Sequence, residues 1–299
     1  MRQMTLALLA SLSLAGTVVP TAAAQENELV VGGKNFTEQQ LISSITTQYL
    51  DHLGYDVDRR AGMGSSVLRQ AQENGQVDLY WEYTGTSLIV YNDVEEKLGP
   101  DEAYARVKEL DAEKGLVWLE PSGVNNTYAL AMRAEDAEER GIATISDLAT
   151  VVNDGAELVF ASNAEFYARD DGLRPMQETY GFSFGRANIK RMDTGLTYSA
   201  LRDEQVDVAI ATTTDGRLSA FNLTVLEDDK GFFPPYAMTP VVSQQALDDN
   251  PDLETQLNEL SARLDDDSMR QLNERVDVDR QTVEDVAEDF LIDEGLIDA

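Results

Sequence analysis

The sequence predicts an α/β protein of two lobes, each a mainly parallel sheet flanked by helices, with a ligand cleft at the hinge between them. Three observations carry this prediction. Strand-like and helix-like patterns alternate along the chain, and a similar order of elements returns in its second half. Without residues 1–24 the chain has about 275 residues, which suits two domains of ordinary size.

The first 24 residues have the layout of a secretory signal peptide. A positive charge at Arg2 precedes the apolar run 4–19, and the small residues 21–24 (TAAA) precede the first polar stretch. Serine and glycine interrupt the run, which is too short for a membrane span of about 20 apolar residues. The chain has no cysteine, so we expect neither a lipid anchor nor a disulfide, and we predict a free periplasmic protein.

The composition is strongly acidic, with 23 Lys+Arg against 55 Asp+Glu and a formal net charge of −32. Nucleic acid is excluded as a partner because phosphate binding requires a basic surface. The hydrophobic content of 42%, arranged periodically, argues against disorder. We interpret the charge as a halophilic-type acidic surface that keeps the protein dissolved in high salt. Attraction of cationic ligands is a second effect that the same charge would have.

The first half opens with a β-α-β-α-β order. The first helix begins at Thr37, where Thr37 and Gln40 resemble a capping box. Its apolar stripe has helical spacing and consists of Ile42, Ile45, Tyr49 and Leu53. We expect strands at residues 28–32, 55–59 and 77–83, and a second helix at residues 66–74.

The second half repeats this order. We expect strands at residues 157–161, 187–191 and 206–210, with a helix at residues 196–203 before the last strand. The phrase QVDL at 76–79 reappears as QVDV at 205–208, each time after a helix that contains Leu-Arg. The acidic stretch from Pro251 onward has a helical pattern, and we expect it to pack on the first lobe. The predicted boundaries are residues 25–130 plus 238–299 for lobe 1 and 131–237 for lobe 2.

Several blocks of the sequence, in one order, resemble the osmoprotectant family of ABC-importer binding proteins, which bind glycine betaine, choline and related quaternary amines. The first block is residues 31–39 (VGGKNFTEQ), similar to the family's SKNFTEQ signature. The others are DLYWEYTGT at 78–86, NTYAL at 126–130, EFYARDDGL at 165–173, TDGR at 214–217, LEDDK at 226–230 and PPY at 234–236. The resemblance covers essentially the whole chain after residue 24. It implies a type II-like periplasmic binding protein fold in a monomer without a cofactor, which serves a separate permease and its ATPase.

The resemblance also implies a set of ligand-binding residues. A trimethylammonium group has no N–H to donate, so aromatic faces recognise it, at roughly 0.5–2 kcal/mol per cation–π contact. A carboxylate at the other end of the ligand needs a cation or oriented amides. The residues that match the family's cage are Tyr83, Tyr128 and Tyr236, and those that match its tail-binding or pocket-lining positions are Lys34, Thr86, Glu165 and Arg169.

Thr212 is a departure from the family pattern, because it stands where the family often has a fourth tyrosine. Trp81, Tyr80 or Tyr167 could supply a ring instead. The departure could equally indicate a bulkier cation, or a solute that is not a quaternary amine. Packing remains the simpler role for Tyr80 and Trp81.

Other roles are open for three of these positions. Arg169 could pair with Asp170 or Asp171, Glu165 could serve only to orient Arg169, and Lys34 could be an exposed loop lysine.

A binding protein for another small polar solute, such as an amino acid derivative, is the alternative function, and an exported enzyme is the less favoured one. The only histidine, His52, lies near the end of a helix where a solvated position is expected. The chain offers no cysteine nucleophile, no G-x-S-x-G motif and no zinc-type spacing. The acidic runs at 248–249 and 265–267 lack the glycine and spacing of a calcium-binding loop. We therefore expect no catalytic and no metal residues.

Overall fold

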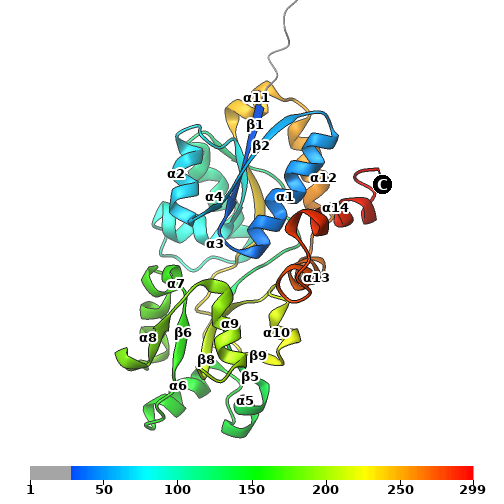
Figure 1. Ribbon diagram of the computed structural model, residues 1–299. Helices are drawn as coiled ribbons and strands as arrows, with labels where there is room; N and C mark the ends of the chain where they lie inside the picture. The colour runs from blue at the N-terminus through cyan, green and yellow to red at the C-terminus, as the bar shows by residue number, and fades with distance from the viewer. Residues whose placement is uncertain (1–27, 299) are drawn as a thin grey trace, which may run out of the picture.

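The computed structural model describes residues 28–298, so the predicted signal peptide at 1–24 lies outside the described residues. The chain forms two halves, each built on one five-stranded sheet (Figure 1). The strand order is β2-β1-β3-β10-β4 in the first sheet and β7-β6-β8-β5-β9 in the second. The predicted two-lobed α/β class is confirmed, and both sheets are mixed: four strands of each run in one direction, and the strand in fourth place, β10 or β5, runs in the opposite direction.

The first sheet grows from the predicted β-α-β-α-β opening. In register, Leu29 of β1 lies opposite Val57 of β2, and Val31 lies opposite Leu79 of β3, all in parallel. The two remaining strands, β10 and β4, join in antiparallel orientation. The elements are β1 (Glu28–Lys34), α1 (Thr37–His52), β2 (Asp56–Met63), α2 (Ser65–Glu73), β3 (Leu79–Tyr83), β4 (Leu116–Trp118) and β10 (Met238–Ser243).

The second sheet repeats this plan position by position. Its strand β6 pairs in parallel with β7 and β8, as β1 does with β2 and β3. Strands β5 and β9 occupy the places that β10 and β4 take in the first sheet, and β5 pairs antiparallel with both its neighbours, as β10 does. The strands are β5 (Tyr128–Arg133), β6 (Phe160–Ser162), β7 (Ile189–Arg191), β8 (Val208–Thr212) and β9 (Leu223–Val225).

The repeated QVD phrase marks equivalent points of the two sheets. Val30 N–H donates to Asp78 Oδ2 at 2.8 Å, and Val159 N–H donates to Asp207 Oδ2 at 2.7 Å. In return, the Asp78 and Asp207 amides donate to the carbonyl oxygens of the same two valines. These bonds join each phrase to a residue 48 positions earlier in the chain, and β3 and β8 each begin two residues later than the patterns at 77–83 and 206–210 predict.

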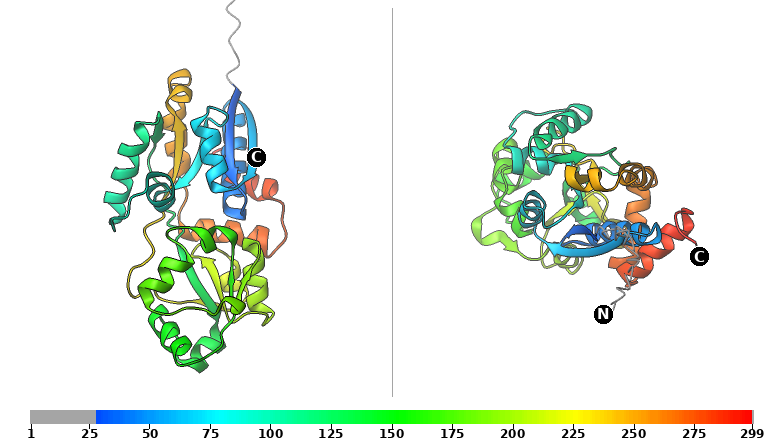
Figure 2. Two further views of the ribbon diagram at one scale, coloured as in Figure 1. Left: turned by 90° about the vertical axis from the view of Figure 1, so that its left-hand side faces the viewer. Right: turned by 90° about the horizontal axis from the view of Figure 1, so that it is seen from above.

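The chain crosses between the halves twice, between β4 and β5 and again between β9 and β10 (Figure 2). The two crossing segments lie side by side. Tyr236 N–H donates to Asn125 Oδ1 at 2.9 Å, and Met238 N–H donates to the Val124 carbonyl at 2.9 Å. Each crossing delivers the antiparallel strand that fills the fourth place of the next sheet.

Helices flank both sheets, and the C-terminal ones return to the first half. There α14 packs along α1 and α12 packs on β10, as the acidic pattern predicts, while α13 also contacts α10 at the junction of the halves (Figure 1). Of the helices beyond α2, the first half has α3 (Thr84–Thr86), the π-helical turn η1 (Ser87–Tyr91), α4 (Pro100–Ala112), α11 (Gln244–Asp249), α12 (Leu253–Ser261), α13 (Asp266–Asp277) and α14 (Val283–Asp293). The second has α5 (Ala134–Arg140), α6 (Ile145–Asn153), α7 (Ala164–Ala168), α8 (Leu173–Tyr180), η2 (Arg186–Asn188), α9 (Thr194–Arg202) and α10 (Arg217–Ala220).

Two predictions about α1 are wrong. Leu53 does not belong to the buried stripe, because it follows the helix as its C-terminal cap and remains 40% exposed. The capping box is absent: Phe36 is the N-cap, and the Thr37 hydroxyl donates to Asp277 Oδ1 at 2.8 Å instead. The rest of the stripe is buried as predicted and packs against α13 and α14. None of the helices within residues 28–298 combines the length and the apolar character that a membrane crossing requires.

Candidate functional site

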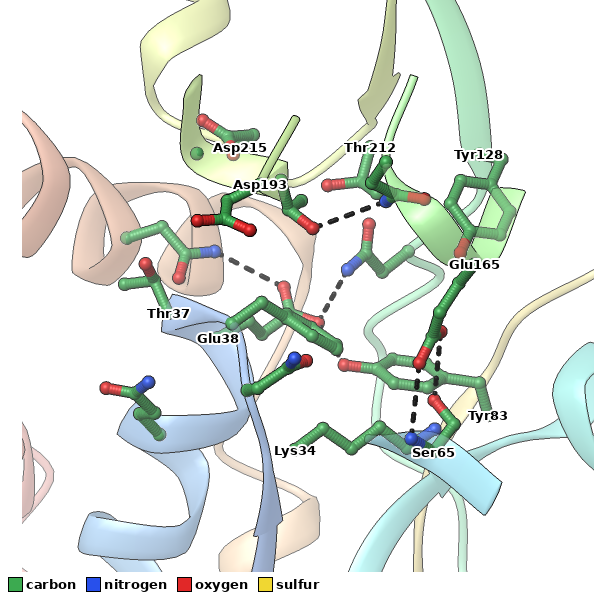
Figure 3. A pocket seen from close by; sticks show the side chains of 18 of the residues that line it. Lys34, Thr37, Glu38, Ser65, Tyr83, Tyr128, Glu165, Asp193, Thr212 and Asp215 are labelled. Atoms are coloured by element: carbon green, nitrogen blue, oxygen red, sulfur yellow. Dashed lines mark hydrogen bonds between the residues drawn. The ribbon is translucent and has the colours of Figure 1, made fainter. Parts of the chain in front are cut away.

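A pocket with a volume of about 510 Å³ lies between the two halves (Figure 3). It opens where parallel strands of both sheets end: Lys34 closes β1, Tyr83 closes β3 and Thr212 closes β8. Carboxyl ends of strands are the usual location of ligands in open α/β sheets. All eight predicted ligand-binding positions line this one pocket: the seven that match the family, namely Lys34, Tyr83, Thr86, Tyr128, Glu165, Arg169 and Tyr236, and the departing Thr212. Their contact with a ligand stays a prediction.

Aromatic rings form part of the pocket wall. The rings of Tyr128 and Tyr236 meet edge to face, with 5.8 Å between their centroids. Tyr83 stacks with Phe36 at 6.3 Å and an interplanar angle of 28°. Phe36 was not among the predicted site residues, although it stands inside the KNFTEQ block, and it brings a fourth aromatic ring to the pocket lining.

Thr212 takes its predicted place in the lining, half-buried and paired in the sheet with Tyr128. None of the three rings considered as substitutes reaches the pocket lining. Tyr80 and Trp81 are fully buried in the first half, which confirms their packing role. Tyr167 is 38% exposed, with the Arg191 guanidinium 4.8 Å from its ring centroid. Within the pocket lining, the aromatic ring that accompanies the three tyrosines is therefore that of Phe36.

Buried carboxylates anchor two of the predicted cage tyrosines. The Tyr83 hydroxyl donates to Glu38 Oε1 at 2.6 Å, and the Tyr236 hydroxyl donates to Asp171. Burial raises the pKa of both phenols well above their ordinary value, so both stay protonated and remain donors. Gly85 lets Tyr236 approach the turn after β3, because a Cβ at that position would lie 2.8 Å from the Tyr236 ring.

Lys34 is a buried residue of the pocket and not an exposed loop lysine. Its ammonium forms an ion pair with Glu82 Oε1 at 2.5 Å, and the two side chains are 2% and 0% exposed. The same ammonium lies 5.0 Å from the centroid of the Tyr83 ring. Lys34 therefore faces the pocket with its charge already balanced.

Arg169 pairs with Asp171 and not with Asp170. Its Nε and Nη2 atoms both donate to the Asp171 carboxylate at 2.6 Å, which fixes the guanidinium plane. From this position Nη2 lies 3.4 Å from the hydroxyl oxygens of Thr86 and Tyr236. The guanidinium also lies over the Tyr128 ring at 5.5 Å, so it joins residues of both halves.

Glu165 connects the halves across the pocket. Its carboxylate accepts from Ser65 N–H at 3.2 Å and from the Ser65 hydroxyl at 3.1 Å, at the first turn of α2 (Figure 3). A carboxylate at a helix N-terminus is favoured by the helix dipole. Arg169 is farther away, with its Nη1 at 3.9 Å from Glu165. The main hydrogen-bond partner of Glu165 is therefore α2 of the opposite half.

Glu38, on the first turn of α1, is the main residue that the sequence reasoning missed. It is 3% exposed, and its carboxylate accepts hydrogen bonds from both halves (Figure 3). The donors besides Tyr83 are Asn126 Nδ2 at 2.7 Å, the Thr214 hydroxyl at 2.5 Å and Asn273 Nδ2 at 3.3 Å. Burial raises the pKa of Glu38, and these hydrogen bonds offset only part of that effect. The sequence could have indicated Glu38 as a site residue, because Glu38 lies inside the same family block as Lys34.

A second charged cluster lies at the far end of the pocket. Arg217 donates to both oxygens of Asp215 and lies 3.0 Å from Asp277 of α13. Burial raises the pKa of Asp277, and Arg217 counters that rise. Asp215 and Arg217 belong to the TDGR block, so that motif holds the second half against α13.

Other residues weighed from the sequence have ordinary surroundings. His52 is exposed at the end of α1. Asp265 caps α13, accepting from Ser268 N–H at 2.8 Å. Within residues 28–298, three or more histidine and carboxylate side chains do not gather at any point that could hold a metal ion.

Known proteins with similar sequences and structures are substrate-binding proteins, in agreement with the pocket between the two halves. Residues 27–293 match the family model described as the substrate binding domain of ABC-type glycine betaine transport systems. A glycine-betaine-binding protein of Pseudomonas aeruginosa is 49% identical over 92% of this chain and 90% of its own length. The glycine betaine-binding protein YehZ of Escherichia coli is 32% identical over 94% of this chain and 95% of its own.

A solved structure is similar over the same range. The crystal structure of a glycine betaine/carnitine/choline ABC transporter superposes with a TM-score of 0.74 and 30% identity. It covers 90% of this chain and 100% of its own.

Proposed function

The chain belongs to the family of substrate-binding domains of ABC-type glycine betaine transport systems, and from this premise we propose that it captures glycine betaine between its two lobes. The family consists of substrate-binding proteins of ABC transporters and not of enzymes. The observation that carries the ligand assignment is the convergence of seven family-matched residues, from both halves, on one aromatic and charged pocket.

The predicted lobes are residues 25–130 plus 238–299 and residues 131–237, and we move the first boundary to Tyr128 because β5 (Tyr128–Arg133) belongs whole to the second sheet. The two antiparallel crossing segments form the hinge, and a ligand in contact with both lobes favours the closed arrangement. Polar contacts that already join the halves around the pocket support this proposal, among them Glu165 with Ser65 and Glu38 with Thr214.

The trimethylammonium group of the ligand would lie against the rings of Tyr83, Tyr128, Tyr236 and Phe36. Each cation–π contact contributes roughly 0.5–2 kcal/mol, and the ammonium sheds water without losing any hydrogen bond of its own. The carboxylate of the ligand would lie toward Arg169 and Thr86, whose donors are close together.

The closed, loaded form would then deliver its ligand to a separate permease driven by an ATPase. The proposal also includes export through the signal peptide at residues 1–24 and a periplasmic location. It further includes a monomeric state and a role for the acidic surface in high salt.

Isothermal titration of the protein without residues 1–24 tests the ligand. We expect saturable binding of glycine betaine, with weaker binding of choline because it has no carboxylate for Arg169. Proline betaine and carnitine complete the series. Failure to bind any of the four would rule out a quaternary-amine function and leave a binding protein for another small polar solute.

A bulkier quaternary amine is the second candidate, favoured by Thr212 in place of a ring and by the volume of about 510 Å³. Substitution Thr212→Tyr separates the two. It should strengthen glycine betaine binding if the short side chain of Thr212 leaves the cage incomplete. It should weaken carnitine binding if carnitine occupies the space beside Thr212.

A further inference from the structure

Glu38 differs in its surroundings from three other buried carboxylates at or beside the pocket. Asp171 and Asp215 each bind an arginine with both oxygens, and Glu82 pairs with Lys34. The Glu38 carboxylate, in contrast, accepts hydrogen bonds from four neutral donors and forms no ion pair within residues 28–298. A buried carboxylate without a counter-charge is unfavourable unless something compensates it.

The carboxylate is coupled to a pocket ring through a short hydrogen bond. Glu38 Oε1 accepts from the Tyr83 hydroxyl at 2.6 Å, and the Tyr83 ring lines the pocket. A phenol that donates to a charged acceptor gains electron density in its ring, and a cation on that ring also feels the charge behind it. The low permittivity around fully buried groups strengthens both effects.

Resting on the proposed function, we propose that Glu38 is a positioning residue that makes the pocket selective for charge: acting through the Tyr83 ring, its carboxylate provides the counter-charge for a quaternary ammonium group. This negative charge compensates for the tyrosine that Thr212 replaces. A neutral group of the same shape would keep its contacts with the rings but gain nothing from Glu38.

The substitution Glu38→Gln removes the charge and keeps the shape. The amide oxygens of Asn126 and Asn273 have no hydrogen-bond partner within the described residues. Either amide can therefore turn to accept from the new glutamine NH₂, and we expect the variant to fold. Circular dichroism and a thermal melt check this expectation.

The measurement compares glycine betaine with tert-butylacetate, in which carbon replaces the quaternary nitrogen. Both ligands carry the same carboxylate, so the ratio of their Kd values isolates the ammonium charge. We expect Glu38→Gln to reduce the preference for glycine betaine by about tenfold, the order of effect of one buried charge several ångströms away. An unchanged ratio with wild-type glycine betaine binding intact would overturn the inference alone. Absence of glycine betaine binding in the wild-type protein would overturn the proposed function as well.

Three further variants separate charge from structure. Tyr83→Phe breaks the link to Glu38 and should lower the ratio, whereas Tyr128→Phe removes a hydroxyl without a carboxylate partner within residues 28–298 and should not. Thr214→Val deletes a donor to Glu38 Oε2 but leaves the charge, so it should affect both ligands equally. In a double-mutant cycle, Glu38→Gln and Tyr83→Phe should be strongly non-additive for glycine betaine. Additive losses would refute the inference, and equal effects of the two Tyr→Phe variants would refute it even if Glu38→Gln failed to fold.

Discussion

Single side chains determine how the pocket recognises a cation, and the tyrosines can be tested directly. Removal of a ring that contacts the ammonium should weaken binding by at least about 1 kcal/mol, since one cation–π contact and its excluded water are lost. We expect this result for Tyr83→Ala and Tyr236→Ala in calorimetric titrations with glycine betaine. Tyr167→Ala is the matched control, because Tyr167 is exposed outside the pocket lining. Unchanged affinity in the first two variants would return those rings to a packing role.

The titration of Glu38 gives a second prediction at this scale. Burial raises its pKa above the ordinary value of 4.5, so the carboxyl takes up a proton as the pH falls through that raised pKa. Glycine betaine affinity should therefore decline on acidification in the wild-type protein and remain level in Glu38→Gln. Tyr83, the titratable neighbour that contacts it, stays protonated because burial raises the Tyr83 pKa, and the charged groups at the far end of the pocket are Asp215, Arg217 and Asp277.

The sign of the accompanying stability effect is opposite. Because the folded pKa of Glu38 is raised, its contribution to the free energy of unfolding is complete below about 4.5 and is lost as the pH rises through the folded pKa. Urea unfolding across the same pH range should show this loss in the wild-type protein. A parallel pH dependence of affinity in Glu38→Gln would show that another group titrates.

At the scale of elements, the helix-turn-strand unit that occurs in both halves has an unstrained turn in the first half and a strained turn in the second. Two residues after the helix that precedes each QVD phrase, the chain has a residue with positive φ. It is Gly75 at 69° in the first half and Glu204 at 57° in the second. A side chain in this left-handed conformation is destabilised by roughly 1 kcal/mol relative to glycine. We expect Glu204→Gly to raise the urea midpoint and Gly75→Ala to lower it, in unfolding monitored by circular dichroism. Destabilisation by Glu204→Gly would mean that the Glu204 side chain makes a contact of its own.

Helices and strands could be predicted where the hydrophobic pattern depends on neighbouring residues. The burial and pairing of a side chain could not be predicted where its partner is distant in the chain. The β-α-β-α-β opening and the QVD repeat rest on neighbouring residues, and both correspond to real elements. Asp111 illustrates the opposite case. Its spacing from Ala103 and Val107 places it on the buried face of α4, but the pattern does not show its partner: the Asp111 carboxylate is fully buried and accepts from Arg69 Nη1 and Nη2 at 2.8 and 2.6 Å.

Burial alone would raise the pKa of Asp111, but Arg69 outweighs it and lowers the pKa to about 2. Because Arg69 lies 42 residues earlier in the chain, only the fold reveals the pair.

At the scale of the whole molecule, contacts across the pocket should govern how long a ligand stays. Ser65 and Glu165 join α2 to α7 of the opposite half, and Ser65→Ala removes one of their two hydrogen bonds. A hydrogen bond to a charged acceptor contributes about 1.5–3 kcal/mol, so ligand dissociation should become faster at nearly unchanged association. Ser66→Ala, at the exposed neighbouring position, is the control in stopped-flow kinetics. Equal rates for the two variants would show that this contact plays no part in closure.

The site was more predictable from sequence than its electrostatics. Motif matching located residues such as Lys34 and Arg169, which the fold brings to one pocket from distant segments. It could not reveal that Glu82 and Asp171 already balance those two cations, while Glu38 has no such partner among the residues that the structure describes. Charge balance depends on which side chains meet, and the blocks do not carry that information.

The exchange of strands between the halves also sets an order in which they can be completed. The second sheet uses a continuous stretch, so all its strands exist once Val225 has been synthesised. The first sheet lacks its fourth strand until residues Met238–Ser243 emerge, after the entire second half. During synthesis, therefore, the half that is translated second can finish folding first, and the N-terminal half must keep a gap in its sheet until the chain returns.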